Sequence, residues 1–160
     1  MIKILFVCHG NICRSPMAEF IMKDLVEREG LSDQFLIESA ATSSEEVWNG
    51  VGNPVYPPAR AELSKHGISC KGKRARVLVR DDYGRYDYLI GMESVNMRNM
   101  KRILGGDPEG KLSKMLDYTS RGGDIDDPWY TGDFAGVYRQ ISSGCKGLLD
   151  HLNETGQIAY

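Results

Sequence analysis

The chemistry that this sequence could support is concentrated in residues 8–15, here called the cysteine loop. Five residues separate Cys8 from Arg14, and Ser15 follows directly. A cysteine thiolate is a strong nucleophile, and arginine presents a planar fork of N–H groups that can grip two oxygens of a tetrahedral anion. Gly10 and Asn11 tolerate left-handed backbone conformations, so the loop can aim successive N–H groups into one concavity. The loop therefore predicts an oxyanion cradle with a thiol at its base.

The flanking residues place the cysteine loop between a strand and a helix. Residues 2–7 form a nearly continuous apolar run rich in β-branched side chains, which is typical of a strand buried on both faces of a parallel sheet. From Ser15 the apolar spacing becomes helical, Pro16 suits the first turn, and Gly30 ends the run. Amide dipoles and the helix N-terminus should lower the pKa of Cys8, and the Ser15 hydroxyl can donate to its sulfur.

Strand and helix patterns alternate along the rest of the chain. We predict further strands over residues 35–39, 86–92 and 111–116, and further helices ending at Gly67, over 94–104 and over 134–152. This alternation predicts an α/β fold in one domain over residues 1–160, with a four-stranded parallel sheet in the flavodoxin-like order 2-1-3-4 and helices on both faces.

Two long connections, 40–58 and 117–132, are predicted to emerge at the carboxyl ends of the strands, where open parallel sheets bind their ligands. Irregular connections of about 12–15 residues or more are uncommon in compact domains and are often functional. We therefore expect both connections to form walls of one site around the cysteine loop.

Composition excludes several classes of function. The chain has 160 residues, is 41% apolar and 26% charged, and carries a formal net charge of −2, which does not suit a dedicated nucleic-acid binder. No apolar run approaches the roughly 20 residues of a membrane span. We therefore expect a cytoplasmic protein with reduced thiols that binds neither nucleic acid nor membrane.

The cysteines and histidines do not form a metal-binding pattern. The four cysteines contain no C-x-x-C pair, and the three histidines are not grouped with them at ligand spacing. We expect neither a metal site nor a cofactor.

The run Val-Cys-His-Gly-Asn-Ile-Cys-Arg-Ser-Pro at residues 7–16 resembles the N-terminal signature of the low-molecular-weight protein tyrosine phosphatases. The resemblance extends over essentially the whole chain, through residues 39–43, 66–68, 74–76 and 87–88 to Asp127-Pro128. It implies an enzyme that hydrolyses phosphotyrosine through a phosphocysteine intermediate. Cys8 would be the nucleophile, Arg14 the phosphate ligand and Asp127 the general acid and base.

The resemblance also assigns supporting roles. It implies that Ser39 and Asn11 hold the shape of a phosphate-binding loop whose other members are His9, Gly10, Ile12, Cys13 and Ser15. Related proteins carry a histidine where this chain has Lys73, and there the histidine helps to lock the asparagine. Lys73 therefore alters the support around Asn11.

The general acid is selected by resemblance rather than by spacing. Asp126 and Asp127 both qualify chemically to protonate a phenolate and then activate water. Asp127 precedes Pro128, which biases it toward an extended backbone. Taken alone, the tripeptide Asp126-Asp127-Pro128 is more typical of an ordinary polar turn than of a catalytic acid.

Aromatic residues in the long connections are candidates for the substrate walls. An aryl phosphate that reaches Cys8 needs flat apolar surfaces, and Trp48, Trp129 and Tyr130 could provide them. Trp48 could equally pack within its own loop.

The role of Cys13 has two interpretations. The resemblance implies a reversible disulfide with Cys8 that protects the nucleophile from irreversible oxidation. The alternative is a small packed side chain.

Three functions are alternatives to phosphotyrosine hydrolysis. Thiol-dependent arsenate reduction needs further cysteines near the nucleophile, whereas Cys70 and Cys145 are isolated in the chain. Phosphoarginine hydrolysis within the family is associated with threonine at the position of Ile12, so Ile12 favours phosphotyrosine. A noncatalytic phosphotyrosine-binding module would not need Cys8, Arg14 and Asp127 together.

The resemblance further implies partners for the enzyme. These are tyrosine-phosphorylated proteins, including a bacterial tyrosine kinase, and phosphate as a product inhibitor. It suggests a monomer or a weak dimer, with secretion by an unconventional route as an alternative to action in the cytoplasm.

Overall fold

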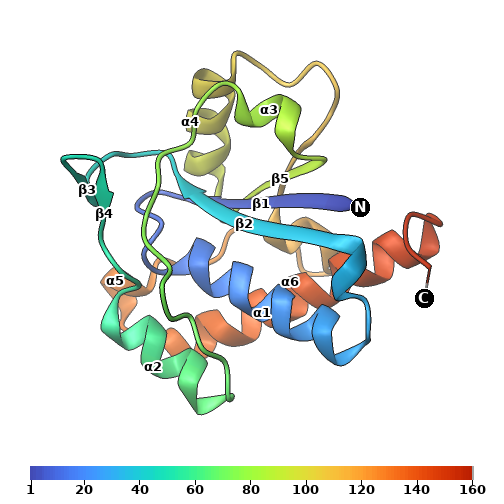
Figure 1. Ribbon diagram of the computed structural model, residues 1–160, viewed down its shortest axis with the longest axis horizontal. Helices are drawn as coiled ribbons and strands as arrows, with labels where there is room; N and C mark the ends of the chain where they lie inside the picture. The colour runs from blue at the N-terminus through green and yellow to red at the C-terminus, as the bar shows by residue number, and fades with distance from the viewer. Residues whose placement is uncertain (160) are drawn as a thin grey trace.

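The computed structural model describes residues 1–159, and its centre is a four-stranded parallel sheet (Figure 1). The sheet runs in the order β2-β1-β5-β6, with β1 at Ile2–Cys8, β2 at Phe35–Ala41, β5 at Tyr88–Gly91 and β6 at Leu112–Lys114. Counted among the strands of this sheet, the order is 2-1-3-4, so the predicted topology is confirmed. β5 and β6 are shorter than the predicted strands, while β1 and β2 extend to Cys8 and Ala41.

Helices cover both faces of the sheet, as predicted. In Figure 1, α1, α2 and α6 lie below the strands, while α3 and α4 lie above them. The helices are α1 at Arg14–Arg28, α2 at Pro57–Lys65, α3 at Asp82–Arg85, α4 at Ser94–Leu104, α5 at Pro128–Thr131 and α6 at Phe134–Glu154, with short 3-10 turns at Ser32–Gln34 and Met115–Tyr118.

Alternate side chains of β1 fill two separate cores. Ile4 and Phe6 pack into the larger core with α1 and α6, whereas Leu5 and Val7 pack into the core beneath α4. All four side chains are fully buried, and each such burial stabilises the fold by about 1.5–3 kcal/mol. β1 is therefore held firmly on both sides, which fixes the position of Cys8 at its carboxyl end.

The connection over residues 40–58 contains structure that the sequence did not indicate. β3 at Val47–Trp48 and β4 at Val51–Gly52 form a small antiparallel hairpin. Asn49 and Gly50 join them with φ angles of 51° and 75°, and positive φ at both central residues is the geometry of a tight hairpin turn. Gly52 is needed for a close approach, because a Cβ there would lie 1.8 Å from the carbonyl oxygen of Ala75.

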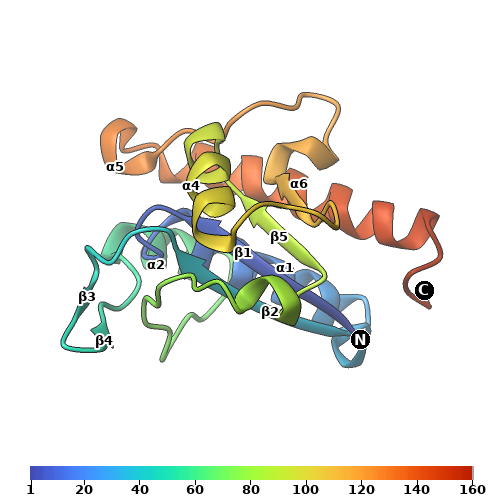
Figure 2. The ribbon, with the colours of Figure 1, turned by 90° about the horizontal axis from the view of Figure 1, so that it is seen from above.

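The hairpin and α5 lie at the same end of the sheet, opposite the N-terminus (Figure 2). This is the end at which the chain leaves β1 and enters the cysteine loop. The two long connections thus meet around the loop, as the topology of a parallel sheet predicts.

Candidate active site

Cys8 is the last residue of β1, and the cysteine loop folds around its sulfur. Asn11 adopts a left-handed conformation with φ of 59°, which lets its backbone N–H turn back and donate to Cys8 Sγ at 3.3 Å. Ser15 Oγ lies 3.0 Å from the same sulfur. The sulfur therefore has two hydrogen-bonding partners, a backbone N–H and a side-chain hydroxyl. Cys8 is 3% exposed, so the sulfur is presented only at the base of the loop.

Arg14 begins α1 and is 2% exposed. Its Nη1 donates to the carbonyl oxygen of Ile125 at 3.0 Å and lies 3.1 Å from a carboxylate oxygen of Glu93. Its Nη2 lies 3.6 Å from Asp127 Oδ2. Burial alone would lower the pKa of Arg14, but the negative charges of Cys8, Glu93 and Asp127 outweigh burial and raise it. The guanidinium is therefore charged and held in a fixed orientation beside the thiol.

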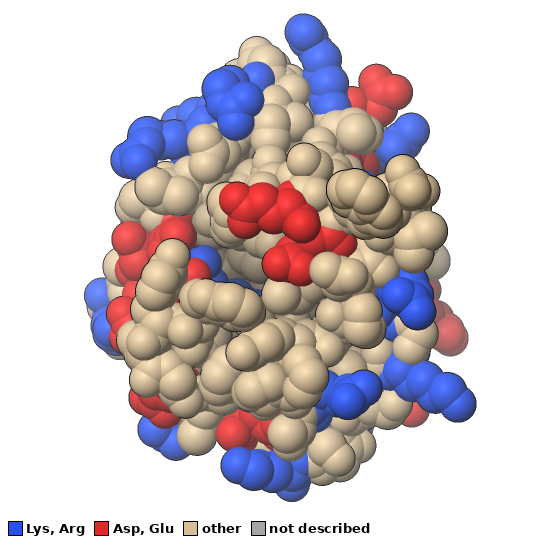
Figure 3. All heavy atoms as spheres, turned by 90° about the vertical axis from the view of Figure 1, so that its left-hand side faces the viewer, with Lys and Arg blue, Asp and Glu red and all other residues tan. Residues whose placement is uncertain are grey.

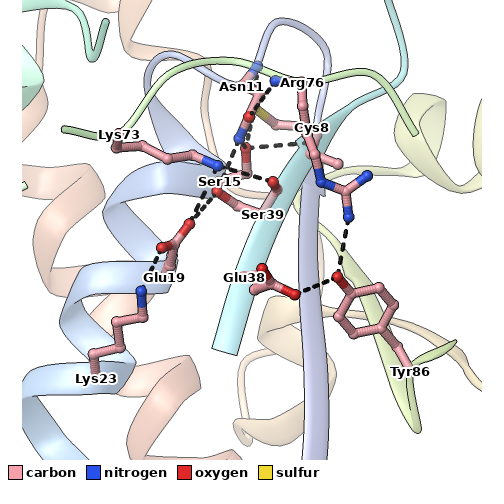
Figure 4. A network of polar contacts seen from close by, with 11 residues as sticks. Cys8, Asn11, Ser15, Glu19, Lys23, Glu38, Ser39, Lys73, Arg76 and Tyr86 are labelled. Carbon is pink, nitrogen blue, oxygen red and sulfur yellow. Dashed lines mark hydrogen bonds and ion pairs between the residues drawn. The ribbon is translucent and has the colours of Figure 1, made fainter. Parts of the chain in front are cut away.

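A buried network of hydrogen bonds holds the rear of the loop (Figure 4). The side-chain amide of Asn11 donates to Ser15 Oγ at 2.8 Å and to Ser39 Oγ at 2.9 Å. Ser39 in turn donates to Glu19 at 2.6 Å. The backbone N–H of Arg76 donates to the Asn11 side-chain oxygen at 3.1 Å. Every polar group of the Asn11 side chain is thereby engaged, which fixes its left-handed backbone.

Lys73 contacts this network at Ser39 and Glu19 rather than at Asn11. Its Nζ donates to the backbone oxygen of Ser39 at 3.0 Å and lies 3.4 Å from Glu19 Oε1. Lys23 pairs with the other Glu19 oxygen at 2.7 Å. Burial lowers the pKa of Lys73, and Glu19 opposes that effect. The sequence raised Lys73 as a change in the support of the loop but did not identify Glu19 as its partner.

A cavity of about 290 Å³ opens above the sulfur. The cysteine loop lines one side of it, through Cys8, His9, Gly10, Ile12, Cys13 and Arg14. Glu45, Glu46, Asp127, Trp129 and Tyr130 complete the lining. The structure thus brings together segments that follow β1, β2 and β6.

Asp127, but not Asp126, lines this cavity. Asp127 caps the N-terminus of α5, where its Oδ1 accepts the backbone N–H of Trp129 at 3.0 Å. Its other oxygen remains directed toward Arg14. The short helix begun by Pro128 therefore helps to fix which of the two carboxylates lines the cavity.

Of the three aromatic residues predicted to form the substrate walls, two line the cavity and one does not. Trp129 and Tyr130 line the cavity, and Trp129 packs against Tyr56 with ring centroids 4.8 Å apart. Trp48 lies on β3, is 79% exposed and is not among the residues that line the cavity. Its contact with a substrate stays a prediction.

Three acidic residues at the site were not predicted from the sequence. Glu93 pairs with Arg14, and Glu45 and Glu46 line the cavity. Glu93 follows the carboxyl end of β5 by two residues, and that position is the signal by which it could have been found. Glu45 and Glu46 lie in the connection over residues 40–58, which was predicted to form a wall of the site, but no pattern singled them out within it.

Cys13 lines the cavity beside Cys8. Burial raises the pKa of Cys13 to about 12, and the negative charges of Cys8 and Asp127 act in the same direction. Cys13 is therefore a neutral thiol near pH 7. All four cysteines are free, and the protective disulfide stays a prediction.

Within residues 1–159, no group of three or more His, Cys, Asp or Glu side chains could hold a metal ion. In the same part of the chain, no helix has the length and apolar character needed to cross a membrane.

The site therefore combines a thiol at the base of a loop with a buried arginine and a carboxylate that lines the same cavity. The sequence profile described as "Low molecular weight phosphotyrosine protein phosphatase" matches residues 3–158. The chain belongs to this family.

The chain is similar along its length to proteins from several bacteria. It is 36% identical to the low molecular weight protein-tyrosine-phosphatase YfkJ of Bacillus subtilis, covering 99% of this chain and 100% of that protein. The crystal structure of YfkJ matches with a TM-score of 0.91 over 97% of this chain and 96% of that one. The low molecular weight protein tyrosine phosphatase of Streptococcus pyogenes is 38% identical, with a TM-score of 0.82 over 95% and 93% of the two chains. The resemblance found in the sequence is confirmed.

Proposed function

We propose that the protein hydrolyses phosphotyrosine in two steps that both use Cys8. In the first step, the Cys8 thiolate attacks phosphorus, the bond to the phenolic oxygen breaks, and Asp127 gives its proton to that oxygen. In the second step, Asp127 takes a proton from water, the water oxygen attacks phosphorus, and the S–P bond breaks. Phosphate leaves, and the thiolate and the protonated carboxyl are restored.

A single observation carries this proposal: Cys8, Arg14 and Asp127 line the same cavity. Arg14 is charged and oriented by Glu93 and Ile125, so it can bind the phosphoryl oxygens as charge develops in the transition state. The hydroxyl of Ser15, 3.0 Å from the sulfur, can stabilise the thiolate as attacking group and as leaving group. Asp127 lines the same cavity from the N-terminus of α5, which supports its role in protonating the leaving phenolic oxygen.

The proposal extends to the partners and the location that the family resemblance implies. The substrates are tyrosine-phosphorylated proteins, which include a bacterial tyrosine kinase. Inorganic phosphate acts as a competitive product inhibitor, because it occupies the same cradle of N–H groups and Arg14. The enzyme works as a monomer or a weak dimer in the cytoplasm, where reducing conditions keep its cysteines as thiols.

The test replaces the nucleophile and separates turnover from binding. Cys8→Ser is expected to abolish hydrolysis of a phosphotyrosine peptide while inorganic phosphate still binds in calorimetry, because the cradle is built from backbone N–H groups and Arg14. Cys70→Ser serves as a matched control, since Cys70 lies outside the cavity. Residual turnover of Cys8→Ser above about one per cent of wild type would exclude covalent catalysis by Cys8.

A further inference from the structure

Two carboxylates and two aromatic side chains form the outer lining of the catalytic cavity. We call Glu45, Glu46, Trp129 and Tyr130 the rim, because they are the lining residues outside the cysteine loop other than Asp127. Figure 3 shows the face on which the hairpin and α5 lie: acidic side chains border the hollow at its centre, and most lysines and arginines lie toward the margin of this face. A substrate that enters the cavity therefore comes close to carboxylate side chains.

Among the described residues, the cations that line the cavity leave one rim carboxylate, Glu46, without an ion pair. Arg14 is buried at its base and already faces Glu93 and Asp127. His9 Nε2 lies 3.0 Å from Glu45 Oε2, and the remaining carboxylate, Glu46, accepts a hydrogen bond from the neutral amide of Asn53 at 2.7 Å. The Glu45 side chain is 68% exposed, so its charge is presented to whatever lies outside the cavity.

The rim also carries aromatic faces that are open to solvent. Tyr130 is 85% exposed and Trp129 is 56% exposed. An exposed aromatic face attracts a lysine or arginine side chain through its quadrupole and gives its aliphatic stem an apolar surface. Carboxylates and aromatic rings that line one cavity are therefore two independent features that favour the same kind of ligand, an organic cation.

From these two features, and resting on the phosphotyrosine hydrolysis proposed above, we infer that the rim recognises a lysine or arginine next to the phosphotyrosine in the substrate. The phosphoryl group is bound by the cysteine loop and Arg14, so its negative charge is met at the base of the cavity. The neighbouring residues of the substrate face Glu45 and Glu46 instead. Basic neighbours are attracted by the rim, and acidic neighbours are repelled.

The experiment compares three phosphotyrosine peptides that differ only in the two residues flanking the phosphotyrosine: lysine, alanine or glutamate. We expect kcat/KM to fall in that order, by about tenfold between lysine and glutamate at low salt, because each exposed charge pair contributes a factor of about 1.4 to 5. The ratio should shrink toward one at about 0.5 M salt, where exposed charges are screened within several ångströms.

Two double variants locate the source of the preference. Glu45→Gln with Glu46→Gln should reduce the lysine-to-glutamate ratio to about twofold. Glu27→Gln with Glu154→Gln removes the same charge from exposed positions outside the cavity and should leave the wild-type ratio in place, so an effect of net charge alone would be revealed by this control.

The outcomes separate the two proposals. If wild type hydrolyses all three peptides equally, or if its preference survives the loss of both rim carboxylates, recognition by the rim is wrong while phosphotyrosine hydrolysis stands. If wild type hydrolyses none of the peptides, phosphotyrosine hydrolysis itself is wrong and the inference falls with it.

Discussion

Ser39→Ala tests whether the buried network behind the cysteine loop sustains both the fold and catalysis. Ser39 lies on β2 directly beside Phe6 of β1 and is fully buried. Its hydroxyl is the only link between the Asn11 side chain and Glu19 among the hydrogen bonds of the described residues. The substitution removes one oxygen atom and therefore breaks that link without opening a sizeable cavity.

The expected loss in the free energy of unfolding follows from the two hydrogen bonds that Ser39→Ala removes. One N–H of Asn11 becomes buried without a partner, which costs about 1–3 kcal/mol, and Glu19 loses a hydrogen bond to a charged group worth about 1.5–3 kcal/mol. Glu19 still faces Lys23 and Lys73, so the combined loss should be smaller than the sum of the upper values. We expect the free energy of unfolding to fall by about 2–4 kcal/mol, which leaves a typical domain folded.

Catalysis should fall as well, because the left-handed conformation of Asn11 is costly unless its side chain is held. We expect kcat/KM for a phosphotyrosine peptide to drop at least about tenfold, the order of effect seen when a transition-state donor is misplaced. Urea unfolding and steady-state kinetics measure the two quantities. Ser64→Ala, at an exposed position of α2, is the control and should change neither.

Neutral surface substitutions usually change the free energy of unfolding by no more than about 0.5 kcal/mol. If the free energy of unfolding of Ser39→Ala differs from that of wild type by no more than this, and its kcat/KM is unchanged, the network does not hold the cysteine loop in place.

The remaining predictions concern Asp127, Cys13 and Lys73. Asp127→Asn should slow phosphotyrosine turnover about 10²-fold or more, with far less effect on a substrate with an acidic phenol; a leaving-group dependence that follows Asp126→Asn instead would refute the assignment. Because burial raises the pKa of Cys13 to about 12, alkylation mapped by mass spectrometry should modify Cys8 at pH 8 and Cys13 only as the pH approaches 12; equal labelling at pH 8 would contradict this. Lys73→Met should lower the free energy of unfolding by about 1–3 kcal/mol, because a buried carboxylate loses one of its cations, and an unchanged urea midpoint would argue against that role.

The sequence by itself determined the features that depend on residues adjacent in the chain. The apolar run of β1, the positive φ available to Asn11 and the helical spacing from Ser15 onward are all local properties. They were enough to predict the strand, the cradle and the helix in order. The alternation of strands and helices then restricted the topology, because parallel strands need crossover connections of one hand, and the predicted order of the sheet is confirmed.

Glu19 shows a signal that was present but unused. It lies four residues after Ser15 on α1, so both side chains project from one face of the helix. Nothing in that spacing indicated that the face would meet Ser39 and Lys73 in a buried network, because their arrival depends on how β2 and the residues after α2 pack against the helix.

The tertiary structure alone decided which distant side chains share the cavity. Arg14 and Ile125 are separated by 111 residues and yet form a 3.0 Å hydrogen bond. Asp127 is distinguished from Asp126 by the short helix that it caps, and Glu45 and Glu46 reach the opening while Trp48 does not. Periodicity in a sequence records which face of an element is buried. The contacts made by irregular connections depend instead on where their ends are fixed, which is settled only when the sheet has assembled.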